Sequence, residues 1–382
     1  MNLSLSDEQV FLREAARGAL SRFKTFEAAR EALDGNDSAL PELWPVACEA
    51  GWPGLLIDEA HDGAGLDVFD AMLVLGECGR VLASVPLLGH LPATAILNDA
   101  PVAAEFLPAL ARGERRAAYL PARPPSDVDE RWSADPAKGL ERPALPTATA
   151  TGEDGRVQVN GSFAFVPDAP GADVLVGVAL QDGRPIGVAI LQDAPGVKVE
   201  PVSRYDSTRS LGHVSLSDAP AVVLDAPEDS LSGAWHLAQA LIASESIGSV
   251  ETALDVSVAY AKERFTFGRA IGSYQAVKHA LTEVLRQLEN GRSLLYYAGW
   301  ARTGAPGEFP LAANAARSVA SRALDQAART MISVHGGTGA TWEHDAPLYF
   351  RRAELSRRLL GGTSGATDRV AGELLAQSTV AA

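Results

Sequence analysis

The first 110 residues place hydrophobic positions at a helical spacing. Leu12, Ala15, Ala16 and Leu20 recur at three- and four-residue steps, and a later apolar run reads FDAMLVLGECGRVL. Ser6 followed by Gln9 is the pattern of a capping box at the start of a helix. The pattern therefore predicts an N-terminal helical domain over residues 1–114.

The hydrophobic period then changes from that of helices to that of strands. Residues 122–149 are rich in proline and charge and predict an irregular connection. The segments RVQVNGSFAFVP, ADVLVGVAL, IGVAIL, VKVEPV and GHVSLS that follow are typical of short strands, and Asn160-Gly161 is typical of a hairpin turn. We expect a small antiparallel, barrel-like sheet domain over residues 115–227.

Long helical patterns return after Ala234 and continue to the end. An alanine-rich stretch, LAANAARSVASRALDQAARTMISV, predicts a closely packed helix. Before it, small and apolar residues alternate at four- and three-residue steps, as in helix seams, at Val277, Leu281, Val284, Leu288, Gly291, Leu295 and Ala298. We predict a four-helix bundle over residues 228–382 and an α+β fold.

Charge and composition exclude several classes of function. Lys plus Arg number 33 against 48 Asp plus Glu, and the net charge of -15 disfavours binding to nucleic acid or to an anionic membrane. The start lacks the features of a signal peptide, so we expect a cytoplasmic protein. Cys48 and Cys78 lack the spacing of a metal site, and we expect buried thiols and no metal.

Two turns between the late helices carry candidate binding residues. In AYAKERFTFGRAIGSYQAVKH, Arg264 could grip phosphate oxygens, Phe267 could stack on a base, and Gln275 adds an amide. An ordinary turn with a solvated arginine is the alternative. In SVHGGTGATWEHD, Gly336 and Gly337 would let backbone amides approach a ligand.

A third glycine turn, LLGGTSG from Leu359 to Gly365, raises a question about chemistry. It should end one helix, and Thr363 or Ser364 would cap another that begins near Thr367. A flat or phosphorylated ligand could approach the glycines closely. However, no side chain between Leu359 and Ala366 can take up a proton. The turn is therefore either a ligand bed without an acid or a plain helix junction.

Taken together and in this order, the motifs resemble those of the acyl-CoA dehydrogenase family over nearly the whole chain. That family forms tetramers of paired dimers, in which a neighbouring subunit holds the adenosine end of FAD. The resemblance implies that the chain binds FAD and an acyl-CoA substrate and assembles with a homologous subunit or as a homodimer or homotetramer. It implies contacts across an interface from Arg264, Phe267, Gln275, Ser333, Gly336 and Gly337, and contacts near the flavin from Phe165 and Thr363.

The sequence departs from the family at the chemical centre. Gly361 stands where many members carry the catalytic glutamate, and Ala238 stands at the alternative position for that base. Pro167 replaces a threonine that gives the flavin N5 a hydrogen bond, and proline has neither the hydroxyl nor an N–H. The resemblance therefore implies a retained adenosine end and a degraded flavin end.

Glu245 is the one visible substitute for the missing base. It is the only formally charged residue from Gly233 to Val250 and lies seven positions after Ala238, on about the same helix face. Partial desolvation would raise its pKa, as removal of a weakly acidic proton requires. Alternatively, Glu245 is bonded to a neighbouring helix or to an arginine.

These features resemble one subunit of the heteromeric acyl-CoA dehydrogenases of actinobacterial steroid side-chain degradation, which pair a base-bearing chain with one that lacks the base. We therefore expect an FAD-dependent acyl-CoA dehydrogenase subunit that completes a shared site with a different chain. One alternative is a self-sufficient homomer that uses Glu245. Another is a non-redox acyl-CoA-binding or structural relative.

Overall fold

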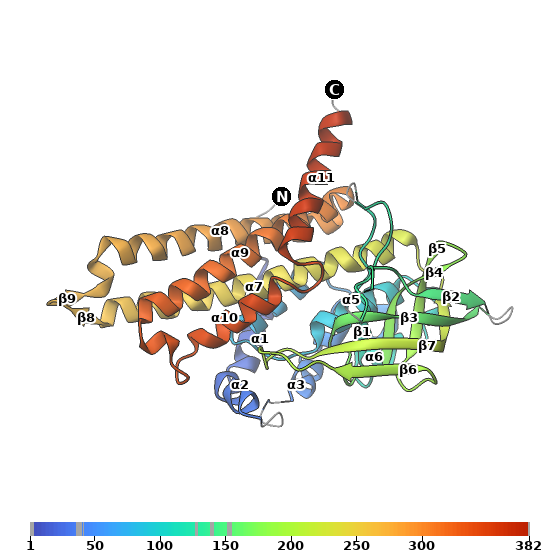
Figure 1. Cartoon of the computed structure of the whole chain (residues 1–382), viewed down its shortest axis with the longest axis horizontal. Coiled ribbons are helices and arrows are strands. Elements are labelled where there is room, and N and C mark those ends of the chain that lie inside the picture. The colour runs from blue at the N-terminus through green and yellow to red at the C-terminus, as the bar shows by residue number, and fades with distance from the viewer. Residues whose placement is uncertain are drawn as a thin grey trace.

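The structure, a computed structural model, describes residues 4–35, 40, 42–126, 129–137, 141–150 and 155–380. Long C-terminal helices form the body, the N-terminal helices lie against one side, and the sheet lies at one end (Figure 1). This arrangement confirms the predicted α+β fold. The predicted domain boundaries at residues 114 and 227 stay predictions, although the first strand begins at Ala117 and the first long helix at Glu228.

The N-terminal part is helical, as predicted. The predicted capping box is present, because Ser6 accepts from the backbone N–H of Gln9 and the Gln9 side chain accepts from that of Ser6. Arg17 of the first helix donates two hydrogen bonds of 2.9 Å to the Glu77 carboxylate of the fourth. The α-helices are α1 (Asp7–Leu20), α2 (Thr25–Leu33), α3 (Trp44–Glu49), α4 (Val68–Arg80), α5 (Leu87–Asn98) and α6 (Leu107–Ala111).

The middle part is a curved sheet that closes on itself. Its order is β1-β4-β2-β3-β7-β5, with β6 beside β7, and the additional pairing of β4 with β5 closes the ring. Most neighbours are antiparallel, but β1 and β2 both pair with β4 in parallel, a difference from the expected sheet. The strands are β1 (Ala117–Tyr119), β2 (Thr147–Ala150), β3 (Arg156–Pro167), β4 (Val174–Gln181), β5 (Arg184–Leu191), β6 (Val197–Pro201) and β7 (Leu211–Leu224).

The predicted hairpin at Asn160-Gly161 is wrong, because β3 continues through both residues. The register against β7 shifts between Val159 and Gly161, which marks a bulge. A Cβ at Gly161 would lie 2.8 Å from the Cα of Pro146, so only glycine fits there. The Asn160 amide donates to Asp218 over 2.8 Å and ties the bulge to β7. Of the predicted irregular connection, residues 127–128 and 138–140 lie outside the described part of the chain.

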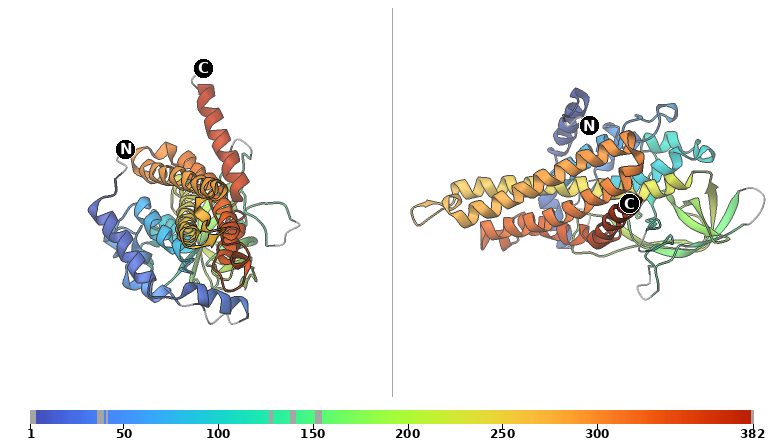
Figure 2. Two further views of the ribbon diagram at one scale, coloured as in Figure 1. Left: turned by 90° about the vertical axis from the view of Figure 1, so that its left-hand side faces the viewer. Right: turned by 90° about the horizontal axis from the view of Figure 1, so that it is seen from above.

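The C-terminal helices form the predicted bundle, with one addition. Helices α7, α8 and α9 run lengthwise with α10 beside them, and α11 projects away from the body (Figures 1 and 2). Of the predicted seam on α8, Val284, Leu288, Gly291, Leu295 and Ala298 are buried. The bounds are α7 (Glu228–Glu263), α8 (Gln275–Gly304), α9 (Phe309–His335), α10 (Ala346–Ser356) and α11 (Gly362–Val380).

Glycines bring the N-terminal helices into direct backbone contact with the bundle. A Cβ at Gly79 of α4 would lie 1.9 Å from the Glu245 carbonyl oxygen of α7. A Cβ at Gly248 would lie 1.9 Å from the Gly76 carbonyl oxygen. The two helices therefore cross so closely that side chains at these positions would separate them.

Both cysteines are free, Cys78 is buried and Cys48 is partly buried. Within the described residues, no group of three or more His, Cys, Asp or Glu side chains could hold a metal ion. None of the helices formed by those residues has the length and apolarity needed to cross a membrane.

Candidate functional site

The turn between α10 and α11 adopts a backbone conformation that glycine favours. The φ angles are 53° at Leu360, 77° at Gly361 and 69° at Gly362. Such positive values are strained for most residues other than glycine. The pair of glycines therefore reverses the chain sharply where α10 ends.

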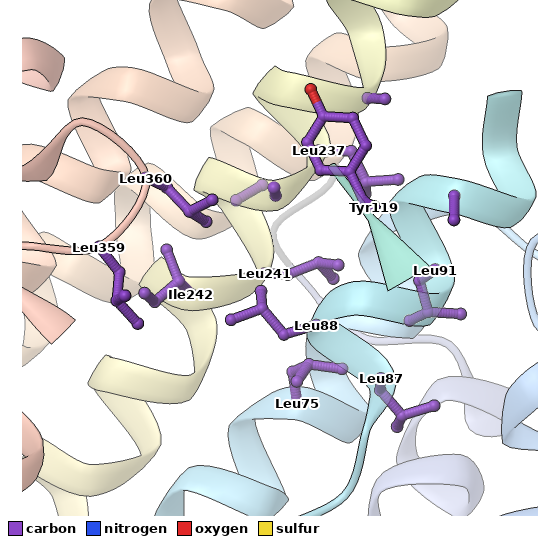
Figure 3. Close-up of a cluster of buried hydrophobic side chains, with 14 of the residues drawn as sticks. Leu75, Leu87, Leu88, Leu91, Tyr119, Leu237, Leu241, Ile242, Leu359 and Leu360 are labelled. Atoms are coloured by element: carbon purple, nitrogen blue, oxygen red, sulfur yellow. The ribbon is translucent and has the colours of Figure 1, made fainter. Parts of the chain in front are cut away.

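Side chains of α7 and α9 donate hydrogen bonds to the backbone of this turn. The Gln239 amide of α7 donates to the Leu360 carbonyl oxygen over 3.0 Å. Arg317 of α9 donates to the carbonyl oxygens of Leu359, over 3.1 Å, and of Ser356. Figure 3 shows Leu359 and Leu360 in a buried hydrophobic cluster beside Ile242 of α7. The turn is thus anchored by both polar and apolar contacts.

Arg317 is a buried cation bonded to carbonyl and hydroxyl oxygens, with no salt bridge to a carboxylate among the described residues. Burial, followed by repulsion from Arg209, lowers the pKa of Arg317 to about 9. Its charge is compensated by the negative end of the α10 dipole, where the last carbonyl groups are exposed. Arg317 therefore acts as a C-terminal cap for α10.

Two amides of the turn are already used by the helix end. The Gly362 N–H donates to Leu359 over 2.9 Å and the Thr363 N–H donates to Arg357 over 3.0 Å. Helix α11 begins at Gly362, so the expected helix start near Thr367 is wrong. The turn is a well-formed helix junction. The N–H groups of Gly362 and Thr363 are therefore not free to bind a ligand.

A cavity of about 630 Å³ lies between the sheet and the bundle and reaches Gly361. Phe165 of β3 is half-exposed in its wall, with φ 50°, and packs edge-on against His213 at 4.8 Å between ring centroids. The lining is largely apolar, with Pro121, Ala134, Pro136, Pro143, Ala164, Phe165, Val202, Leu211, Trp235, Leu355, Leu359 and Leu360 as its apolar members.

The position beside Gly361, where a side chain would begin, faces an arginine and a tryptophan. A Cβ there would lie 3.2 Å from Cζ2 of Trp235 and 3.3 Å from Nε of Arg123. The Arg123 guanidinium carbon lies 5.9 Å from the Trp235 ring centroid, within the range of a cation–π contact. Arg123 also pairs with Asp135 at 3.2 Å. A cation therefore lies beside Gly361, the position at which the family resemblance implies a catalytic glutamate in many members.

A second hollow of about 790 Å³ lies on the other side of the same turn. Gly361 and Arg358 line both hollows, so the turn separates them. Thr363 lies at the second hollow, as do Ser364, Arg322 and Arg357. The predicted residues Phe165 and Thr363 are thus close to the glycine turn but line different hollows.

Glu245, the candidate base, is buried in an ion-pair network. Arg209 donates to one carboxylate oxygen of Glu245, and Arg352 donates to the other over 2.7 Å. Burial opposes charge on Arg352, yet Glu245 and Asp206 raise the pKa of Arg352 above its usual value. Burial likewise opposes charge on Asp206, but Arg352 and Thr208 hold the pKa of Asp206 below its usual value.

Glu245 is 4% exposed and does not line the cavity beside Gly361. Both carboxylate oxygens of Glu245 already accept hydrogen bonds from buried guanidinium groups, so neither oxygen is free to face a substrate in that cavity. This geometry favours the second interpretation of Glu245, in which it is bonded to arginines.

The predicted arginine and phenylalanine lie on an exposed hairpin at the end of the bundle farthest from the sheet (Figure 1). Strands β8 (Phe265–Thr266) and β9 (Arg269–Ala270) form this hairpin. Phe267 and Gly268, with φ of 51° and 78°, make its two-residue turn, and glycine is typical at such a position. Phe267 is 95% exposed at the tip.

Arg264 is exposed at the base of the hairpin, and its guanidinium contacts no partner among the residues that the structure describes. Gln275 is exposed at the first position of α8. Phenylalanine and arginine are both enriched at binding interfaces, and this hairpin exposes one of each. The hairpin is therefore a strong candidate for contact with a ligand or another chain.

Ser333, Gly336 and Gly337 are exposed at the end of α9. Gly336 has φ 61°, and a Cβ on Gly336 or Gly337 would meet no atom within 4 Å. Backbone here is open to approach, and its contact with a ligand stays a prediction. The next glycine, Gly339, is buried, and its Cβ would lie 2.7 Å from the Ile332 carbonyl oxygen, so packing accounts for it.

The residues that shape the cavity and the turn carry little signal in the sequence. Arg123 lies in the proline-rich connection, where a charge reads as solvated, and Trp235 lies on a helix where an aromatic residue reads as core. Gln239 and Arg317 gave a weak signal, since both are polar residues within runs of alanine and other small or apolar residues. Burial of a polar residue in such a run requires a specific hydrogen-bond partner.

Comparison with known proteins relates the chain to one family throughout. The family model described as the acyl-CoA dehydrogenase N-terminal domain matches residues 6–114, and that described as the C-terminal domain matches residues 232–375. Acyl-CoA dehydrogenase IpdE2 of Mycobacterium tuberculosis is 31% identical over 356 residues, which are 93% of this chain and 93% of that protein. Acyl-CoA dehydrogenase FadE34 of the same species is 32% identical over 97% of this chain and 48% of its own length.

Solved structures agree with this relationship. A variant of the Tcur3481-Tcur3483 steroid ACAD has a TM-score of 0.85 at 28% identity, covering 99% of this chain and 100% of that one. The ChsE4-ChsE5 complex from Mycobacterium tuberculosis shares the fold, with a TM-score of 0.85 at 24% identity over 98% and 99% of the two chains. The described fold, the family models and the identity to IpdE2 together place this chain in the acyl-CoA dehydrogenase family.

Proposed function

We propose that this chain is one subunit of an FAD-dependent acyl-CoA dehydrogenase and completes the FAD site of a homologous, base-bearing partner. The observation that carries the proposal is the contrast between its two ends. The hairpin presents an unpaired Arg264 and a fully exposed Phe267 to a neighbour. The cavity at the other end has Gly361 in place of an acid, beside the cation Arg123.

The residues of the hairpin end fit the adenosine and phosphate part of FAD. A guanidinium without a partner can donate two hydrogen bonds to phosphate oxygens, and an exposed phenyl ring can stack on a base. Gln275 and the open backbone at Gly336 and Gly337 add polar contacts at the same end of the molecule. Ser333 is the last of the residues at this end that the family resemblance implies as contacts of FAD.

Bound FAD supplies the acceptor of a hydride from the β-carbon of the acyl thioester. Removal of the α-proton needs a carboxylate within hydrogen-bond reach of that carbon. Gly361 and Ala238 have no such group, and Ala238 is fully buried. In this proposal the partner's site carries out desaturation, and the chain described here binds and orients part of the cofactor.

The relatives support a paired arrangement and a substrate class. Two of the solved structures named above are complexes of two different chains, and one is described as a steroid ACAD. We therefore infer a heteromeric, cytoplasmic enzyme of steroid degradation whose substrate is a steroid-derived acyl-CoA thioester.

The self-sufficient homomer is the second candidate. In it, Phe165 and Thr363 would contact the flavin of the same chain, and Glu245 would be the base. The arginine pairs that surround Glu245 weigh against this candidate. A non-redox relative that binds acyl-CoA is the third candidate, and retained flavin absorbance in the purified protein would exclude it.

The test measures desaturation of acyl-CoA thioesters with an artificial electron acceptor. The chain alone should be inactive or nearly so, because absence of a general base typically costs about a hundred- to ten-thousandfold in rate. Mixing with a base-bearing partner should restore turnover. Robust turnover by the lone chain that disappears in Glu245→Gln, in samples of the variant shown to be folded, would instead establish the self-sufficient homomer.

A further inference from the structure

The cavity beside Gly361 has no role in the proposed accessory function, in which the hairpin completes the FAD site of a partner. That hairpin lies at the opposite end of the helix bundle. Yet it has a volume of about 630 Å³ and is well within the size range of ligand sites. Its lining combines an apolar wall with a few charged groups. Those charged groups indicate what kind of molecule it accepts.

Arg123 presents a donor to the cavity that has no acceptor. Its Nε is buried and makes no hydrogen bond to any described residue. The same atom lies 3.3 Å from the position that a Cβ on Gly361 would occupy. A buried N–H without an acceptor is costly, and an anionic oxygen placed there would satisfy it.

The only carboxylate paired with Arg123 in the described residues leaves this donor free. Asp135 contacts Nη2, at 3.2 Å, and its side chain is 52% exposed. Arg358, on the rim, is already bonded to the Tyr205 hydroxyl over 3.0 Å and paired with Glu354 at 3.3 Å. Arg204, the third arginine of the lining, already donates to the carbonyl oxygens of Val202 and Ser207. Of the three arginines, Arg123 is the one whose unused donor lies beside Gly361, and it is therefore best placed to receive a ligand's negative charge.

The remainder of the cavity favours an apolar ligand body. The rings of Trp235 and Phe165 and the side chains of Leu211, Leu355 and Leu359 all line it. The apolar wall cannot satisfy a second charge, and the two carboxylates of the lining, Asp135 and Glu141, would repel a second negative one. A ligand with one anionic group at one end and a hydrophobic body matches both features.

We propose that this cavity binds an organic carboxylate, with the carboxylate accepting a hydrogen bond from Nε of Arg123 beside Trp235 and the hydrophobic body against the apolar wall. The missing acid at position 361 makes room for the ligand's own carboxylate. This binding is separate from the FAD contacts of the hairpin and does not rest on the proposed accessory function.

The test compares two probes that differ only in their polar end. Decanoate and decan-1-ol are titrated calorimetrically into the full chain as purified, at neutral pH. Decanoate should bind at least about tenfold more tightly, because a hydrogen bond to a charged group is stronger than one to a neutral group. Arg123→Gln should remove this preference while leaving decan-1-ol binding unchanged.

Two further variants guard against misfolding and nonspecific charge effects. Asp135→Asn removes the competing carboxylate and should strengthen decanoate binding. Arg131→Gln removes an exposed arginine of the same segment and should change nothing. The proposal is overturned if decanoate does not bind, if both probes bind equally, if Arg123→Gln retains the preference, or if Asp135→Asn weakens binding. FAD content of Arg123→Gln in the complex with a partner separately reports on the accessory function and should be unchanged.

Discussion

The two ends of the bundle differ in how their polar groups are satisfied. At the hairpin end, Arg264, Phe267 and Gln275 are exposed, and Arg264 has no partner among the described residues. At the sheet end, Glu245 and Arg317 are buried and bonded on several sides. The first arrangement is suited to binding something outside the chain. The second is suited to holding a turn and a cavity in shape.

This difference decides how much weight exposure and burial carry as evidence of function. Exposed side chains contribute little to the stability of their own chain, so an exposed arginine and phenylalanine on one hairpin are better explained by binding than by folding. Buried charges, in contrast, can be retained for stability alone once they are paired, since removal of one partner is costly. A buried acid is therefore weaker evidence for catalysis here than an exposed arginine is for binding.

The largest effect on stability should come from Glu245→Gln. The change leaves Arg209 and Arg352 buried with less opposing charge, and breaking such a buried pair costs about 3 to 5 kcal/mol of the free energy of unfolding. Chemical denaturation measures it. Glu289→Gln, which removes an exposed partner of Arg292, is the control and should have a much smaller effect. A stable Glu245→Gln protein would remove the structural account of this residue.

The pH dependence of stability should arise at the sheet end, partly from Asp168. Burial raises the pKa of Asp168 to about 6, although its carboxylate accepts a hydrogen bond from the Gly89 N–H over 2.8 Å. Since this folded-state pKa lies above the usual value of 3.8, the folded chain holds the proton more tightly. The stabilising contribution is therefore fully present below about pH 4 and lost as pH rises through 6.

Asp168→Asn removes this titration. Relative to the wild type, the free energy of unfolding of Asp168→Asn should rise by up to about 3 kcal/mol between pH 4 and pH 7. Denaturation curves of the two proteins at several pH values provide the difference. A difference that does not change with pH would show that Asp168 keeps its ordinary pKa in the folded chain.

Restoring an acid at position 361 should not restore the base. A residue other than glycine at φ 77° is strained, by about 1 to 3 kcal/mol. The new side chain would also start 3.3 Å from Arg123, whose charge would hold the pKa of the glutamate low. Gly361→Glu should thus be less stable than the wild type and inactive alone.

Gly233→Ala serves as the matched glycine control for this experiment. Gly233 lies in α7 with nothing within 4 Å of its Cβ position, so alanine there should be neutral or slightly stabilising. Turnover by Gly361→Glu without a partner would show that the cavity needs only an acid to become a dehydrogenase site.

Much of the fold could be predicted because local patterns agree with the tertiary structure. The helix seam on α8 and the strand segments follow directly from hydrophobic period. The hairpin prediction at Asn160-Gly161 was wrong because a glycine that suits a turn also suits a β-bulge, here packed against Pro146. The helix start at Gly362 was missed because three successive positive φ angles are set by tertiary contacts to Gln239 and Arg317.

The candidate site was harder to predict for a physical reason. An exposed motif residue such as Phe267 can be recognised from its local sequence, because it needs no distant contact within the chain. A buried charge cannot be recognised in this way, because its partner can come from any distance along the chain. Glu245 meets Arg352 across 107 positions, and Gly361 meets Arg123 across a longer separation still. Such pairs carry no local signal.

The contrast between the two ends is tested most directly by FAD content in the complex with a base-bearing partner. Arg264→Ala and Phe165→Ala are compared by flavin absorbance and by FAD titration, with Arg269→Ala, on the same hairpin, as control. We expect Arg264→Ala to weaken FAD binding about ten- to a hundredfold, because it removes charge-assisted phosphate contacts. Phe165→Ala and Arg269→Ala should retain FAD. Loss of FAD in Phe165→Ala with full retention in Arg264→Ala would contradict the account.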